Sequence, residues 1–223
     1  MKYLNQISAL LAAGTLVAVS LPLWAQQDVQ NSQATEAAVL TQGADAAPPM
    51  NTQQEEQEMV TKDVLGYEME TIDGGKQKLD AFRGKVIMMV NVASECGLTP
   101  QYEQLEKLYR EHKKDGLVII GFPANNFAGQ EPGTNAEIAE FCSSKFGVTF
   151  PMMAKISVKG EDAHPLYKQL AAQPEPIGGE PEWNFDKYVV NRAGEVVARF
   201  KPRTTPEDPA VIKKLKDLLA EDS

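Results

Sequence analysis

A segment near the middle of the chain, VIMMVNVASECGLTP from Val86 to Pro100, joins a strand pattern directly to a helix start. Its first five residues are apolar without a break, which is typical of a strand covered on both faces. Thr99 is a favourable N-cap residue, and Pro100 suits the first position of a helix. The apolar residues that follow recur at helical spacing. The segment therefore predicts a strand, a short loop that contains Cys96, and a helix.

The same alternation of elements continues on both sides of this segment. Leu117–Phe122 is a second unbroken apolar run, which predicts a second interior strand, and Thr134 with Glu137 forms a capping-box pattern before another helix. Shorter signals predict an opening hairpin around 73–75, a strand over 150–156, a short helix over 164–171, a hairpin with strands at 189–190 and 196–200, and a last helix from 205–206. This order predicts an α/β fold with one mixed sheet between helices. Functional sites of such sheets form beyond the carboxyl ends of the strands, where Cys96 and the loop 123–133 both lie.

Composition limits the classes of protein to which the chain can belong. Its 223 residues are enough for one domain with an ordinary core, and 43% hydrophobic with 24% charged residues is typical of globular proteins. The formal net charge is −9, and no block of Lys or Arg interrupts the acidic balance. Nucleic-acid binding needs clustered positive charge, so we expect no nucleic-acid partner.

The first 60 residues differ from the rest. In residues 1–25, Lys2 is the only charged residue, and an apolar stretch runs from Ile7 to Trp24 before Ala25. This pattern predicts a secretory signal peptide that is cleaved after Ala25; a retained membrane anchor is the alternative, because the stretch is about long enough to span a bilayer. Residues 26–60 are rich in Gln, Ala, Glu and Asp and lack aromatic residues, which predicts a flexible polar tether. Residues 61–223 remain as the globular domain, exported to the periplasm or secreted.

The two cysteines, Cys96 and Cys142, are the candidate reactive residues. A cysteine just before a helix N-terminus is placed for reactivity, because the helix dipole and free backbone N–H groups favour the thiolate; a small buried apolar residue is the alternative. In an oxidising compartment the pair could also form a structural disulfide. The sequence has no C-x-x-C, no H-E-x-x-H, no Cys/His cluster and no phosphate-binding loop, so we expect neither a dithiol–disulfide oxidoreductase nor a metal site.

Three ordered motifs resemble the signatures of one enzyme family. They are Asn91–Thr99, then Gly121–Pro123 with Asn125 and Gly129–Gly133, and finally Trp183–Phe185, with Phe150-Pro151 as a short link. From about Val64 to Leu219 the chain resembles the glutathione peroxidases. The resemblance implies a thioredoxin-like fold and reduction of hydrogen peroxide and organic hydroperoxides, with Cys96 as the attacking residue. It also implies that Gln130, Trp183 and Asn184 complete the active site, where their amide and indole N–H groups can hold a thiolate and the departing oxygen.

Cys142 distinguishes the chain from the selenocysteine-containing members of that family. Its position resembles the resolving cysteine of a two-cysteine branch, in which the oxidised first cysteine condenses with the second to a disulfide. A core residue on an apolar helix face is the alternative. The resemblance implies an external thiol reductant, a thioredoxin-like protein or glutathione, and no prosthetic group. It also implies a monomer, because the segment 172–182 is short where tetrameric members carry an insertion. A redox sensor, or a binding module with a static disulfide, stays open as another function.

Overall fold

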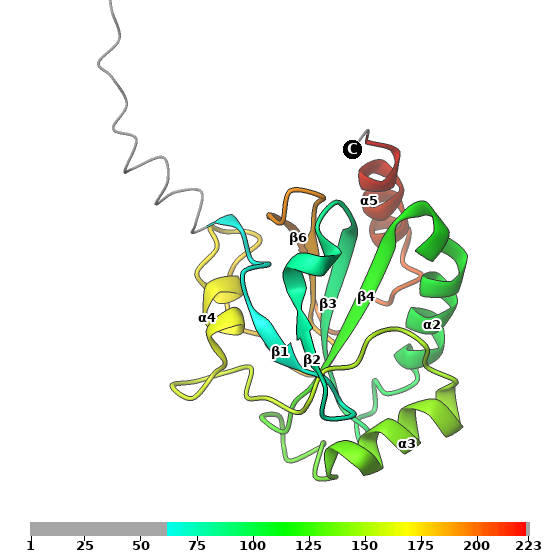
Figure 1. Ribbon diagram of the computed structural model, residues 1–223, viewed down its shortest axis with the longest axis vertical. Coiled ribbons are helices and arrows are strands. Elements are labelled where there is room, and N and C mark those ends of the chain that lie inside the picture. Colours follow the sequence, from blue (N-terminus) through cyan, green and yellow to red (C-terminus); the bar gives the residue numbers. More distant parts are fainter. Residues whose placement is uncertain (1–61, 222–223) are drawn as a thin grey trace, which may run out of the picture. The chain divides into compact units, whose positions relative to one another are not determined.

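The structure of the protein is a computed structural model, and it describes residues 62–221. The expected signal peptide and the whole of the expected tether, residues 26–60, lie outside the described residues. The elements, labelled in Figure 1, are β1 (Glu68–Glu70), β2 (Lys76–Lys78), η2 (Leu79–Phe82), β3 (Val86–Val92), α2 (Gln101–His112), η3 (Lys113–Asp115), β4 (Leu117–Pro123), α3 (Asn135–Phe146), α4 (Pro165–Ala171), β5 (Lys187–Val190), β6 (Val196–Phe200) and α5 (Pro209–Ala220). None of the helices in this part of the chain has the length and apolar character that crossing a membrane requires.

The central sheet has the strand order β4-β3-β5-β6. β3 pairs in parallel with β4 and antiparallel with β5, so the sheet is mixed, as the sequence predicts. Every residue of β3 is buried. The prediction of a second interior strand at Leu117–Phe122 is wrong, because β4 lies at the edge of the sheet. Its outer side carries only an isolated bridge between Gly121 and Met152 and a hydrogen bond from the Ile156 N–H to the Pro123 carbonyl. β4 is apolar because both of its faces are covered, and not because it has a strand on each side.

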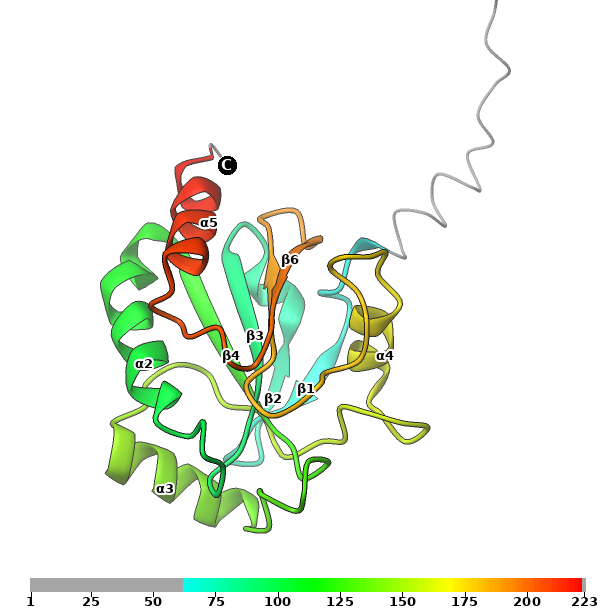
Figure 2. The same ribbon diagram turned by 180° about the vertical axis from the view of Figure 1, so that it is seen from behind.

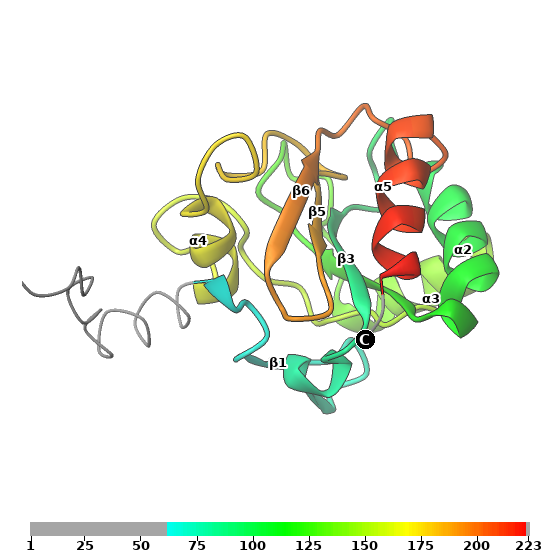
Figure 3. The ribbon, with the colours of Figure 1, turned by 90° about the horizontal axis from the view of Figure 1, so that it is seen from above.

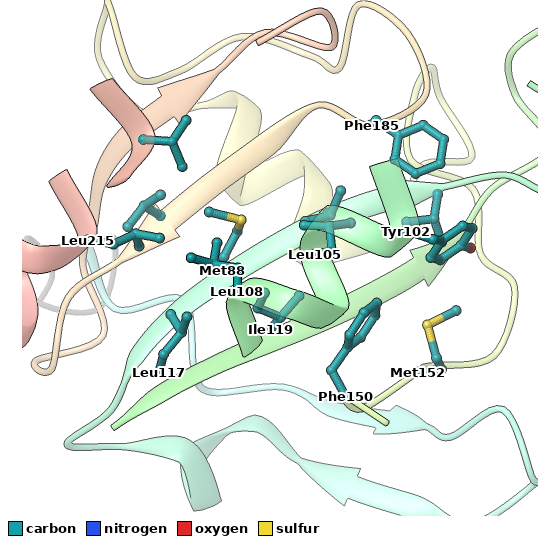
Figure 4. Packing of buried hydrophobic residues seen from close by; sticks show 14 of the residues in the cluster. Met88, Tyr102, Leu105, Leu108, Leu117, Ile119, Phe150, Met152, Phe185 and Leu215 are labelled. Carbon is teal, nitrogen blue, oxygen red and sulfur yellow. The ribbon is translucent and has the colours of Figure 1, made fainter. Parts of the chain in front are cut away.

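Helices cover the two faces of this sheet unequally. α2 and α5 lie together on one face, and α4 lies on the other side, as Figure 3 shows. Alternate residues of β3 supply the two cores: Met88 packs with Leu105 of α2 and Leu215 of α5, whereas Met89 packs with the β1–β2 hairpin and α4. Figure 4 shows the first core in detail. The alternation follows from the two-residue period of side chains along a strand.

Local signals predicted several elements correctly and two incorrectly. The capping box at Thr134 is present, and its hydroxyl accepts the backbone N–H of Glu137. The segment 150–156 contains only isolated bridges and no strand, in keeping with Pro151, which has no N–H to donate to a ladder. The last helix begins at Pro209 and not at 205–206, because the carboxylate of Asp208 accepts the N–H of Ala210 and caps it there. Thr205-Pro206 and Asp208-Pro209 both match the pattern of an N-cap residue followed by proline, and the helix begins at the second pair.

The loops that follow β3 and β4 meet at one end of the sheet. The N–H of Ala124 donates to the carbonyl of Val92 at 3.1 Å, and the N–H of Glu95 donates to the carbonyl of Gln130 at 3.0 Å. α3 lies across this same end of the sheet in both Figure 1 and Figure 2. The expectation that chemistry converges beyond the carboxyl ends of these strands therefore has a structural basis.

Candidate active site

Cys96 lies in a tight turn between β3 and α2 that is held by Thr99. The backbone N–H of Cys96 donates to the Thr99 hydroxyl at 3.0 Å, and that hydroxyl donates to the carbonyl of Ala93 at 2.9 Å. The expectation that Thr99 caps the helix is therefore wrong: α2 begins at Gln101, and Pro100 occupies the cap position. The hydroxyl has closer partners within the turn, so it bridges the two sides of the cysteine loop.

The sulfur of Cys96 accepts a backbone hydrogen bond and faces a groove. The N–H of Leu98 points at Sγ at 3.4 Å, and an N–H donor stabilises a thiolate more than a thiol. The side chain is only 9% exposed, but it lines a groove of about 510 Å³ together with Trp183, Leu98 and Pro202. Lys201 and Arg203 also line this groove. Cys96 is therefore largely packed but borders a groove.

Trp183 is positioned through its backbone and its ring. The Asn91 side-chain amide donates to the Trp183 carbonyl at 3.0 Å and accepts the N–H of Asp186 at 3.1 Å. The indole ring lies 5.5 Å from the Phe127 ring and stays 38% exposed, in the groove of Cys96. Sequence reasoning did not assign a role to Asn91. The signal was there, because an amide at the end of an otherwise apolar buried strand needs a hydrogen-bond partner.

A buried ion pair braces the same segment from the other side. Arg199 of β6 donates to both carboxylate oxygens of Asp186 at 2.9 Å, and both side chains are almost completely buried. Arg199 also donates to the carbonyls of Gly178 and Glu180, so it ties the segment before Trp183 to the sheet. Such a pair would be costly if one partner were removed. Sequence reasoning missed both residues.

Phe185 carries backbone strain next to the site. Its φ angle of 68° is in the left-handed region, which residues with large side chains rarely adopt. Its N–H donates to the Asn91 carbonyl at 2.6 Å, and its ring packs edge-on against Tyr102 at 5.5 Å (Figure 4). The strain follows directly after Asn184, and strained residues of this kind cluster at functional sites.

Gln130 and Asn184 lie in contact. The Asn184 amide donates to Gln130 Oε1 at 2.9 Å, and Asn184 is fully buried. This bond orients the Gln130 side chain and leaves its own amide N–H groups without a partner among the described residues. The Gln130 carbonyl holds the N–H of Glu95, so the pair is attached to the Cys96 loop. Trp183 lines the same groove as Cys96, but Gln130 and Asn184 do not.

Cys142 lies near the end of α3 and is 2% exposed. Burial raises the pKa of its thiol to about 11, and the nearby Tyr102 hydroxyl offsets part of this effect. Both cysteines are free thiols in this structure. Within residues 62–221, no group of His, Cys, Asp or Glu is arranged to hold a metal ion.

A reachable cysteine at the carboxyl end of the central strand defines a protein built for thiol redox chemistry on an α/β fold. The fold is thioredoxin-like: a thiol:disulfide interchange protein of the thioredoxin family from Chlorobium tepidum matches 69% of this chain and 93% of its own chain with a TM-score of 0.52 at 16% identity.

The family follows from closer relatives. The family model for glutathione peroxidase matches residues 64–171. The thioredoxin/glutathione peroxidase BtuE of Escherichia coli (strain K12) is 43% identical over 178 residues, which are 70% of this chain and 97% of that protein. The crystal structure of T. cruzi GPX1 matches with a TM-score of 0.58 at 35% identity, over 71% of this chain and 97% of that one. The chain belongs to the glutathione peroxidase family and is a thiol peroxidase.

Proposed function

We propose that the protein reduces hydrogen peroxide and organic hydroperoxides by a two-cysteine mechanism and so protects against oxidative stress. The observation that carries the proposal is the position of Cys96, whose sulfur accepts the Leu98 N–H and which lines a groove together with Trp183. In the first step the Cys96 thiolate attacks the distal peroxide oxygen, the O–O bond breaks, and water or an alcohol leaves. Cys96 becomes a sulfenic acid.

Gln130 and Trp183 serve this first step as hydrogen-bond donors, and Asn184 orients the Gln130 side chain. The bond from Asn184 to Gln130 Oε1 leaves the Gln130 amide free to donate, so we assign Gln130 and Trp183 to the departing oxygen and Asn184 to positioning. Donors that are fixed before the reaction stabilise developing charge without reorganisation. Asn91 and the Asp186–Arg199 pair hold this arrangement in place.

In the second step Cys142 attacks the sulfur of Cys96, and water leaves. Disulfide geometry requires the two Cα atoms to approach within about 7 Å, so the end of α3 must open. Two features support this motion. Ile138 and Cys142 are the only fully buried residues of α3, and Cys142 lies near the end of the helix, where Gly147 terminates it. A helix end with so little buried surface opens at low cost.

A thiol reductant then regenerates the pair. We assign this role to a thioredoxin-like protein, with glutathione as the alternative; the name of the Escherichia coli relative includes both. A static structural disulfide is disfavoured, because both thiols are free in a fully packed fold.

We further propose that the chain acts as an exported monomer. The intact mass of the exported protein should correspond to a chain that begins near Gln26, and a mass that includes residues 1–25 would contradict export with cleavage. Light scattering should give the molar mass of a single chain, and a stable tetramer would contradict the monomer.

The test uses Cys142→Ser, with Ser143→Ala as the matched control one residue away. Cys142→Ser should consume one equivalent of peroxide in a burst and then stop turning over with a thioredoxin system, because the sulfenic acid has no partner thiol. Ser143 lies on the exposed side of α3, so Ser143→Ala should turn over as the wild type does. If Cys142→Ser runs at the wild-type rate, Cys142 is a core residue and the enzyme uses one cysteine.

A further inference from the structure

Lys187, the first residue of β5, is a buried cation that has no role in the peroxidase steps proposed above. Its side chain is fully buried, and its ammonium donates to the Phe185 carbonyl at 2.6 Å and to the Pro202 carbonyl at 3.5 Å. The neighbouring carboxylate of Asp186 is engaged by Arg199 on both of its oxygens. In the described part of the chain, Lys187 therefore has carbonyl partners but no carboxylate bonded to it.

Burial of this ammonium is unfavourable for folding. Removal from water lowers the pKa of the Lys187 amine to about 7, and the charge of Asp186 offsets only part of that effect. An apolar side chain of similar length would fill the same space without this cost. Buried charges without an ion-pair partner occur where a function requires them, so the two carbonyls that Lys187 bonds indicate what it does.

The first of these carbonyls belongs to the strained residue Phe185. Its N–H donates to the Asn91 carbonyl at 2.6 Å and its carbonyl accepts the Lys187 ammonium, so both of its backbone polar groups are held. A large residue in the left-handed region keeps that conformation only where its surroundings fix it. The side chain of Asn91 also holds the Trp183 carbonyl. The direction of the Phe185 peptide therefore sets the course of the chain that carries Trp183.

The second carbonyl belongs to Pro202, at the groove of Cys96. Three segments line this groove, 96–98, 182–183 and 201–203. Lys187 joins the second segment to the third through its two hydrogen bonds. The Gln101 side-chain amide donates to the same Pro202 carbonyl at 2.8 Å, and Gln101 begins α2, the helix that follows the first segment. The three walls of the groove are thus connected at this one carbonyl.

We propose that Lys187 is a positioning residue of the peroxidase: it fixes Trp183 at the groove by bonding two backbone carbonyls at once. This inference rests on the role proposed above for Trp183. Lys187 does not line the groove, so it acts through the two backbone segments that do. Its amine keeps N–H groups for both carbonyls whether or not it is protonated. The indole N–H is then in place before peroxide binds, as a preorganised donor must be.

The experiment compares Lys187→Met with Val189→Ala in the reduced full-length protein. Met has nearly the length of Lys but no N–H to donate. Val189 is fully buried on the same face of β5, so its truncation destabilises the core without removing a side-chain bond to either segment. Urea unfolding reports the stability of each variant. If Lys187→Met does not fold, Lys187→Gln replaces it, because its amide is one bond too short to serve both carbonyls.

Two quantities are measured on the folded proteins. One is the rate of the peroxide burst at Cys96 with one equivalent of hydrogen peroxide. The other is the time-resolved fluorescence anisotropy of Trp183, whose fast decay reports local motion of the indole. The chain has two tryptophans, so every protein in the comparison also carries Trp24→Phe.

We expect Lys187→Met to slow the burst by about 10- to 100-fold, the loss that a misplacement of catalytic groups by up to about 1 Å produces. The amplitude of the fast anisotropy decay should rise, because the segment that carries the indole is no longer fixed. Val189→Ala should keep the wild-type burst rate and the wild-type anisotropy, although it is less stable than the wild type.

A wild-type burst rate in Lys187→Met would overturn the positioning role, and so would an unchanged anisotropy of Trp183. Equal slowing in Val189→Ala would also overturn it, because the effect would then follow from lost stability. Failure of the proposed function gives different results. A wild-type protein without a burst would contradict peroxide reduction at Cys96, and a wild-type burst rate in Trp183→Phe would contradict the role proposed for Trp183.

Discussion

Replacing Thr99 with Val tests how the cysteine loop is held. Thr99 is 5% exposed, and its hydroxyl both accepts the N–H of Cys96 and donates to the carbonyl of Ala93. Val has nearly the same shape, so the substitution removes both hydrogen bonds and leaves no cavity. The two backbone groups are then buried without a partner, at a cost of roughly 1–3 kcal/mol each.

The expected loss in the free energy of unfolding is therefore about 2–6 kcal/mol, or a fall in Tm of roughly 6–18 °C for a domain of this size. The matched control is Thr134→Val, which removes the capping hydroxyl of α3 at an exposed site. Water can replace that hydroxyl, so the control should lose only about 1 kcal/mol, the usual cost of an N-cap.

The assay is urea unfolding of the reduced proteins, followed by the rate of the peroxide burst. Thr99→Val should also react more slowly with peroxide, because the turn that points Cys96 Sγ at the Leu98 N–H is loosened. Thr134→Val should keep the wild-type burst rate. If Thr99→Val is no less stable than Thr134→Val, the hydroxyl does not bridge the loop and Thr99 behaves as an ordinary helix cap.

Three further predictions concern single groups. Cys96→Ser should abolish peroxide reduction without unfolding the domain, because a hydroxyl is not a nucleophile at neutral pH; residual turnover near the wild-type rate would refute the assignment. With a pKa near 11, Cys142 should resist iodoacetamide in the native reduced protein at pH 7 and react once urea unfolds the chain, as peptide mass mapping can show. Burial lowers the pKa of Lys187 to about 7, so between pH 7 and about 10 the unfolded chain binds the extra proton and the free energy of unfolding should rise with pH. Urea unfolding at pH 7 and 9 should show less of this rise in Lys187→Met, and an equal rise in both proteins would contradict the lowered pKa.

Much of the fold was predictable because its signals are local. The unbroken apolar run before Cys96 predicted the central strand, and the capping box at Thr134 predicted the start of α3. The motifs around Cys96, Gln130 and Trp183 also indicated the family and the end of the sheet where these residues meet. Each of these signals depends on neighbours within a few residues, so the local sequence is enough to predict the feature without knowledge of the rest of the fold.

The remaining features depend on contacts between distant segments. A strand whose two faces are both covered has the same unbroken apolar pattern at the centre and at the edge of a sheet. The sequence therefore did not show that β4 is an edge strand. Threonine is a common helix N-cap residue, so the sequence predicts a cap at Thr99. Only the tertiary structure shows that its hydroxyl is hydrogen-bonded to the backbone of Cys96 and Ala93 instead.

The supports of the site are also decided by tertiary structure. Asn91 reaches Trp183 across 92 positions of the chain, and Arg199 meets Asp186 between strands. Glu131 looks like one more polar loop residue in the sequence, yet folding buries it completely beside α3. Local pattern determined where the reactive cysteine lies along the chain. Its surroundings were decided by burial and long-range hydrogen bonding, because the free energy of a polar group depends on which distant segments exclude water from it.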